Sequence, residues 1–226
     1  MKAVLAIKAL SEVTAWQWGL VTASQAQGVG VSRLTLSRLT SAGLLKRIRQ
    51  GVYLDSSVPD SWLTPLRAQW LSFKPRILAF QRLEAIDTEV VVGSRTACWV
   101  WGVGDFDEIP YTFYSASRIK RETEGVKTVT ITLETEDVTI IEGIPVTTQT
   151  RTVIDIMREG FDLGGVGQVI NEFGFENIDF DRVRASSQNL KKAYGLSKKQ
   201  FIAQINDFET RAKIVRLQSL GLTNSD

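Results

Sequence analysis

The chain has 226 residues, of which 43% are hydrophobic and 23% charged, values typical of a globular protein with one large or two smaller domains. Its net charge of only +2 excludes a polybasic nucleic-acid coat. A single cysteine, Cys98, and the absence of histidine exclude an intramolecular disulfide, Cys/His zinc sites, and Ser-His-Asp or Cys-His catalysis. We therefore expect no metal, no other cofactor and no catalytic residue.

Charge is distributed unevenly along the chain. Residues 1–54 contain seven Lys and Arg side chains but one acidic side chain, a net charge of +6, so residues 55–226 sum to −4. A basic module attached to a mildly acidic body is expected when that module contacts phosphate. No apolar stretch approaches the roughly 20 residues that cross a bilayer, and Lys8 interrupts the short apolar run at the N-terminus. We expect a cytoplasmic protein without membrane contact.

The first third of the sequence predicts three helices. Residues 2–18 have apolar positions at helical spacing and no Gly or Pro, and Gly19 ends this helix. A short second helix follows, with Thr22 as its N-cap and Gln25 completing a capping box. Ser32 is the expected N-cap of the third helix.

The third helix is predicted to have two chemically different faces. Successive residues are rotated by about 100°, so the pattern separates a buried face from an exposed one. Arginine can bind guanine edges or phosphates, serine can bind either, and leucine can contact a thymine methyl group. The buried face is predicted to contain Thr35, Leu36, Leu39 and Ala42. The candidate DNA-binding residues of this helix are Ser32, Arg33, Leu34, Ser37, Arg38 and Ser41.

A basic hairpin follows the third helix. Residues 44–49 and 51–54 are predicted to form two short strands around Arg49-Gln50-Gly51. The order of helices and hairpin is that of a winged helix-turn-helix, with Lys46, Arg47 and Arg49 of the wing placed for backbone phosphates. A three-helix domain that uses its hairpin for protein contacts is the alternative, and the local charge of +6 favours DNA.

The remainder of the chain is predicted to form a second, larger domain. Turn-forming residues at 55–62 place the boundary, giving a winged helix-turn-helix domain at 1–56 and a larger α+β domain at 57–226. A helical pattern over 63–86 is broken at Lys74-Pro75, and a buried helix follows over 94–101, with Ser94 as its expected cap.

Residues 111–147 change from helical to strand patterning. Alternation and β-branched residues predict a mostly antiparallel sheet, with Glu142-Gly143 as a turn. Helical patterns then continue to the C-terminal end. The predicted strands are 111–115, 127–133, 138–141 and 144–147, and the predicted helices are 149–158, 162–174, 179–194 and 197–218.

Two polar features of this domain are candidates for a site. The basic, hydroxyl-rich loop 115–121 could hold a phosphate or nucleotide, but because it lacks a glycine nest the interpretation as a solvated loop is favoured. Thr148 is expected to cap the helix that carries Arg151 and Asp155, which are one turn apart. That pair could lie at the mouth of a site, or it could tie the start of the helix to the sheet, and the second interpretation is favoured.

Three segments, taken in order, resemble the AbiEi-type antitoxins. The first runs from Gly30-Val31-Ser32-Arg33 to Gly51-Val52-Tyr53, the second from Val92-Gly93-Ser94-Arg95-Thr96-Ala97 to Gly102, and the third from Gly143 through Val146-Thr147 and Arg151-Thr152 to Asp155. Ser94 stands where the family commonly has histidine, so no role of that imidazole can operate in this chain.

The resemblance implies an antitoxin that represses its own promoter at inverted repeats, with dimerisation on DNA. It also implies that the C-terminal domain neutralises a nucleotidyltransferase-type toxin of a phage abortive-infection operon, in many systems without a stable complex. The candidate polar site of that domain comprises Ser94, Arg95, Arg118, Lys120, Arg121, Thr148, Arg151 and Asp155.

Two other functions remain open at this point. The chain could be a stand-alone winged-helix regulator whose C-terminal domain senses a ligand or dimerises. It could also be a nuclease, but the sequence contains no Asp-x-Lys or Glu-x-Lys, the carboxylate–lysine spacing frequent in metal-dependent nucleases.

Overall fold

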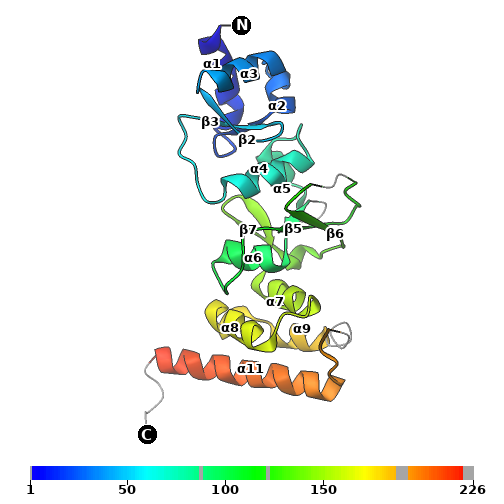
Figure 1. Ribbon diagram of the computed structural model, residues 1–226. Coiled ribbons are helices and arrows are strands. Elements are labelled where there is room, and N and C mark those ends of the chain that lie inside the picture. The colour runs from blue at the N-terminus through cyan, green and yellow to red at the C-terminus, as the bar shows by residue number, and fades with distance from the viewer. Residues whose placement is uncertain (1, 87–88, 121–122, 187–192, 221–226) are drawn as a thin grey trace. The chain divides into compact units, whose positions relative to one another are not determined.

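The computed structural model describes residues 2–86, 89–120, 123–186 and 193–220. The chain divides into two compact units, Met1–Val90 and Val91–Asp226, and Figure 1 labels most of their helices and strands. This division differs from the predicted boundary after residue 56. Helix α4 (Thr64–Phe73) packs against the strands of the first unit, so the segment that follows residue 56 belongs to that unit.

The first unit begins with the predicted winged helix-turn-helix. Its strands form an antiparallel sheet in the order β1-β3-β2. The first of these strands was not predicted, because three residues are too few to show alternation, and it exists through pairings such as Thr22 with Val52. The elements are α1 (Ala3–Thr14), β1 (Leu20–Thr22), α2 (Ala23–Gly28), α3 (Arg33–Ser41), β2 (Leu45–Arg49) and β3 (Val52–Asp55).

Two predicted helix caps are confirmed. At α2, the backbone N–H of Gln25 donates to the Thr22 hydroxyl at 3.1 Å, and the backbone N–H of Thr22 donates to the side-chain Oε1 of Gln25 at 2.9 Å. At α3, the amide of Thr35 donates to the Ser32 hydroxyl at 3.2 Å. These caps satisfy backbone donors that a helix start leaves unpaired. The core beneath them consists of Ala6, Leu10, Val13, Val21, Ala26, Val31, Leu36, Leu39 and Leu45.

A fully buried ion pair joins the last two helices of the first unit to its C-terminal end. Arg82 of α5 (Ala79–Leu83) donates to Glu89, and both side chains are 0% exposed. The Arg82 guanidinium also lies 3.4 Å from the Trp70 ring centroid and donates to the Trp70 carbonyl at 2.8 Å. A buried charge is costly unless it is paired, so the ion pair and the Trp70 contacts join α4 and α5 to Glu89, although the Arg82 Nε has no hydrogen-bond partner among the described residues.

The second unit contains a five-stranded sheet in the order β6-β5-β4-β8-β7. Its α+β class is as predicted, but the sheet is mixed and not mostly antiparallel, because β4 pairs with β8, and β5 with β6, in parallel. Alternation shows which residues form strands and carries no information on their direction. The strands are β4 (Val91–Val92), β5 (Tyr111–Ser115), β6 (Val126–Thr130), β7 (Val138–Ile141) and β8 (Ile144–Thr147).

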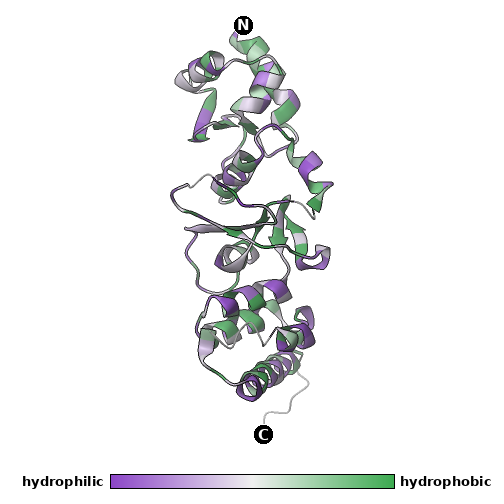
Figure 2. Cartoon of the chain, turned by 90° about the vertical axis from the view of Figure 1, so that its right-hand side faces the viewer, coloured by the Kyte–Doolittle hydropathy of each residue, from purple (hydrophilic) through white to green (hydrophobic). Residues whose placement is uncertain are grey.

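Helices complete the second unit. On α11, buried Phe201, Ile205 and Phe208 recur every three or four residues and pack towards α8 and α9. Figure 2 shows the same helix, which precedes the C-terminal end, with hydrophobic and hydrophilic residues interleaved, as expected for an amphipathic helix. The elements are α6 (Ser94–Trp101), η2 (Thr135–Asp137), α7 (Gln149–Arg158), α8 (Leu163–Phe173), η3 (Phe175–Asn177), α9 (Phe180–Ala185) and α11 (Lys198–Ser219). Part of the predicted helix 179–194 lies outside the described residues.

The start of α6 corrects one predicted cap. Gly93 is the N-cap, and Ser94 is the first helical residue, with a φ of +53°. The Tyr114 ring packs so closely on Gly93 that a Cβ at this position would overlap it. This contact therefore requires glycine at position 93. The preference of helix caps for Ser, Thr, Asp and Asn favoured Ser94 because it takes no account of such a distant contact.

We expect Arg82→Met to lower the free energy of unfolding by about 3–5 kcal/mol, because the Glu89 carboxylate then stays buried without its main partner. Urea unfolding measures the change. Lys46→Met is the matched control, since it breaks an exposed pair with Asp60 (side chains 61% and 44% exposed) and should cost under about 1 kcal/mol. Equal losses of unfolding free energy in the two variants would contradict the expectation that the buried pair stabilises the fold more than the exposed pair does.

Candidate functional site

Helix α3 has the two faces that its sequence predicts, with one exception. Leu36 and Leu39 are buried, and Thr35 is partly buried. Ala42 was expected on the buried face but is exposed, because α3 ends at Ser41 and Ala42 already belongs to the turn that follows. The residues exposed to solvent include all six candidates, namely Ser32, Arg33, Leu34, Ser37, Arg38 and Ser41.

The exposed face of α3 carries groups that suit the major groove of DNA. Arg33 and Arg38 make no ion pair with any residue that the structure describes, so their guanidinium groups can reach base edges or phosphates. Leu34 is 62% exposed, an unusual place for leucine that suits an apolar contact with a thymine methyl. The Ser32 hydroxyl already accepts the amide of Thr35, so its cap role competes with any base contact.

The wing contributes three basic residues in different environments. Arg47 is exposed on β2, whereas Arg49 is half buried. Lys46 is exposed too, but its Nζ lies 2.5 Å from an Asp60 carboxylate oxygen. The hydrogen bond and charge of Lys46 hold the pKa of Asp60 below its usual value. Arg47 therefore remains the wing cation best placed for phosphate.

The eight candidate polar residues of the second unit do not form one site. Because β4 and β8 are parallel, Ser94 and Thr148, which follow them, lie at the same edge of the sheet. Strand β5 is antiparallel to β4, so the loop that carries Arg118 and Lys120 leaves the sheet at the opposite edge. Arg121 lies outside the described residues.

At the first edge, Arg151 is the centre of a buried ionic cluster. Its Nε donates to both Asp155 carboxylate oxygens, at 2.9 and 3.1 Å. Its Nη1 donates to Asp137 Oδ2 at 2.8 Å, and Asp137 also accepts from Arg182 at 2.6 Å. The predicted Arg151–Asp155 pair is present, and this geometry favours the interpretation that it ties α7 to the sheet.

Asp137 is the member of this cluster that sequence reasoning missed. It is 14 residues from Arg151, so helical spacing gives no signal. The hairpin register does: Val138 pairs with Thr147 across the Glu142-Gly143 turn, and Thr148 N donates to the Asp137 carbonyl. Pairing the two strands residue by residue outward from the Glu142-Gly143 turn places Asp137 opposite Thr148, at the start of α7.

Ser94 and Arg95 have contrasting surroundings. Ser94 is fully buried, and its hydroxyl has no hydrogen-bond partner among the described residues. Arg95 is exposed, lies 5.4 Å from the Phe161 ring centroid, and has its Nε 3.6 Å from Glu159. Thr148 is half buried and makes no side-chain cap bond.

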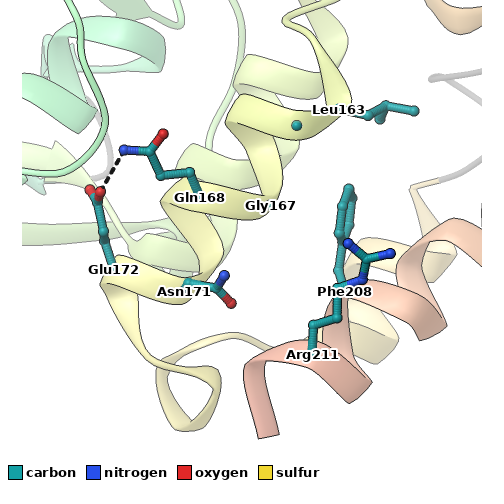
Figure 3. A pocket seen from close by; sticks show the side chains of 8 residues that line it. Leu163, Gly167, Gln168, Asn171, Glu172, Phe208 and Arg211 are labelled. Atoms are coloured by element: carbon teal, nitrogen blue, oxygen red, sulfur yellow. Dashed lines mark hydrogen bonds between the residues drawn. The ribbon is translucent and has the colours of Figure 1, made fainter. Parts of the chain in front are cut away.

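The second unit also contains an open cavity of about 480 Å³ between α8 and α11. In Figure 3, Phe208 and Arg211 enter it from α11, opposite Gln168 and Asn171 of α8. The Gln168 amide donates to Glu172 at 2.8 Å. A second cavity of about 490 Å³ is bordered by Arg95, Lys127 and the rings of Phe106 and Phe161, which contact each other at an interplanar angle of 41°.

No group of three or more metal-binding side chains was found among the described residues. In the same residues, no helix is both long and apolar enough to span a bilayer.

We expect the Asp155 carboxyl group to make stability depend on pH. Burial raises its pKa from 3.8 to about 6, against the lowering effect of Arg151, so the folded state holds this proton more tightly than the unfolded state does. Its contribution to stability is complete below the unfolded pKa and is lost as the pH rises through about 6.

Urea unfolding of the wild type and Asp155→Asn across that pH window tests this dependence. The stability of the wild type relative to the variant should fall as the pH rises. A relative stability that stays constant or increases with pH would contradict the raised pKa.

Comparison with solved structures shows the fold. The crystal structure of the RV2827C protein from Mycobacterium tuberculosis superposes with a TM-score of 0.52 and 13% sequence identity. The match covers 89% of this chain and 81% of that one. At this identity the likeness concerns the fold alone.

Sequence comparisons add one finding. No curated protein matches the chain in sequence. Residues 8–54 match the family model described as transcriptional regulator, AbiEi antitoxin. These residues extend from α1 to the end of the wing, so the predicted resemblance to the AbiEi-type antitoxins is confirmed for the winged helix-turn-helix segment.

Proposed function

We propose that the chain is a DNA-binding transcriptional regulator of the antitoxin type, which contacts double-stranded DNA through α3 and the wing. The observation that carries the proposal is the exposed face of α3, where two arginines without an ion-pair partner among the described residues lie beside an exposed leucine and two serines. The match of residues 8–54 to a regulator family supports it. Promoter DNA is cytoplasmic in bacteria, so this role implies a cytoplasmic protein.

The contacts divide into two kinds. Ser37, Arg38 and Ser41, together with Arg33 and Leu34, are proposed to read base edges in the major groove. The wing residues Lys46, Arg47 and Arg49 are proposed to contact phosphates, and they set position and affinity without reading sequence. Two chains bound as a dimer would read the two halves of an inverted-repeat operator.

The antitoxin role is a further step of the proposal. The second unit would neutralise a nucleotidyltransferase-type toxin encoded in the same operon, as part of phage abortive infection. Co-expression with the product of a neighbouring toxin gene tests this step, since relief of growth arrest supports it and unrelieved toxicity contradicts it. The role requires no catalytic step, so metal-dependent cleavage of plasmid DNA that a chelator abolishes would contradict it.

A second candidate function is a stand-alone regulator whose second unit senses a small molecule. The cavity between α8 and α11 favours this alternative, because it has the volume of a ligand site and combines an aromatic ring with amide and charged groups (Figure 3). A solitary gene without a toxin neighbour would favour it over the antitoxin role.

DNA binding is tested by fluorescence anisotropy with a duplex from the region upstream of the gene. If three to five basic groups contact phosphate, the log–log dependence of affinity on salt should have a slope of about −3 to −5. Arg33→Gln/Arg38→Gln should weaken binding at least about tenfold, because each arginine supplies a charge-assisted contact.

The matched control is Arg216→Gln, an exposed arginine of the second unit, which should leave affinity and slope unchanged. Absence of binding at about 100 mM salt, where phosphate contacts of this number still hold the complex, would overturn the proposed function.

A further inference from the structure

The turn between α4 and α5 carries one more exposed arginine, Arg76. This turn lies outside the helix-turn-helix but is hydrogen-bonded to it. We infer that Arg76 is an additional phosphate-binding residue, which extends the DNA contact of the wing along the start of α2. The inference rests on the proposed function and deepens it. Arg76 lies beyond both the matched residues 8–54 and the predicted domain 1–56.

The position of Arg76 is set by a well-formed β-turn. The Ile77 amide donates to the Lys74 carbonyl at 3.2 Å, so Pro75 and Arg76 are the two central residues of the turn. Proline in the first central position fixes φ for such a turn. The Arg76 side chain therefore projects from a defined point and not from a long loop.

Hydrogen bonds attach this turn to the start of α2. The Thr22 hydroxyl donates to the Pro75 carbonyl, and the Gln25 side-chain amide donates to the Ile77 carbonyl at 3.0 Å. Both bonds come from residues that form the capping box of α2. The two carbonyls on either side of Arg76 are thus held by the helix-turn-helix itself.

A buried side-chain amide behind the turn makes this attachment specific. Gln17 donates to Gln25 Oε1 at 2.7 Å and to the Leu20 carbonyl at 2.8 Å, and its own oxygen accepts from the Ala79 amide at 3.3 Å. Gln17 and Gln25 are each at most 5% exposed. Buried amides with their hydrogen bonds satisfied hold one geometry, because the alternatives leave polar groups unpaired.

The wing reaches the same point of α2 from its other side. The Ala23 amide donates to the carbonyl of Gly51, in the wing turn, at 2.8 Å. The wing turn and the turn of Arg76 thus bind adjacent residues, Ala23 and Thr22. In a bound helix-turn-helix the first helix crosses the DNA backbone while the second enters the major groove, so this end of α2 faces phosphates.

The Arg76 guanidinium is exposed and can bind a phosphate, whereas the Lys74 ammonium group is already paired. Lys74 is 2.9 Å from Glu89 and is engaged in that ion pair. Arg76 is exposed and has no ion pair or hydrogen bond from its side chain among the described residues. A guanidinium group presents parallel donors that match two oxygens of one phosphate.

The experiment measures binding of the whole 226-residue chain to a fluorescein-labelled duplex of mixed sequence, about 30 base pairs long, at several salt concentrations. Mixed sequence suffices because a phosphate contact is independent of sequence. Arg76→Gln should weaken binding about three- to tenfold and reduce the salt slope by about 0.9. Arg76→Lys keeps the charge and should keep most of the slope.

The outcomes separate this inference from the proposed function. If Arg33→Gln/Arg38→Gln loses binding to the duplex from the region upstream of the gene while Arg76→Gln keeps the wild-type affinity and slope on both duplexes, Arg76 is not a contact and the proposed function stands. If the wild type binds neither duplex, both fail. Thermal unfolding of Arg76→Gln should match the wild type, because the side chain is exposed and makes no hydrogen bond or ion pair with any described residue; a large loss of stability would assign Arg76 to folding and overturn the inference.

Discussion

Two buried side-chain amides hold the first unit together. Gln17 and Gln25 hydrogen-bond to each other, to the backbone of β1, and to the segment that joins α4 to α5. Since an unsatisfied amide in this interior would cost free energy, α2 keeps its position only while that segment is in place. The winged helix-turn-helix is therefore held by hydrogen bonds to the segment between α4 and α5, which lies beyond residue 56.

The second unit depends on a comparable constraint at the start of α7. Arg151 binds two buried carboxylates, of Asp137 and Asp155, and so links the β7–β8 hairpin to the helix that follows it. Such a cluster is costly to break because removing one member leaves a buried charge unpaired. Its charged groups bind mainly one another and so support the fold, although the Nη2 of Arg151 is buried without a hydrogen-bond partner among the described residues.

These two constraints give the units different kinds of surface. The first unit exposes Arg33 and Arg38 on α3 and Arg47 on the wing, and none of these three forms an ion pair with another described residue. The second buries the cluster of Arg151, Asp137 and Asp155 and has cavities beside α8 and α6. Recognition of a long, charged polymer suits the first surface, whereas the second suits a partner or ligand of defined shape.

The sequence by itself determined what depends on neighbours along the chain. The Thr22–Gln25 and Ser32 caps, the faces of α3 and the strands 111–115, 138–141 and 144–147 follow from spacing over a few residues. Only the tertiary structure decided strand direction, the glycine requirement at Gly93, the role of Asp137 and the attachment of residues 57–90 to the first unit. Each of these is a contact between segments far apart in sequence, and no local period encodes which distant residue completes a buried hydrogen bond.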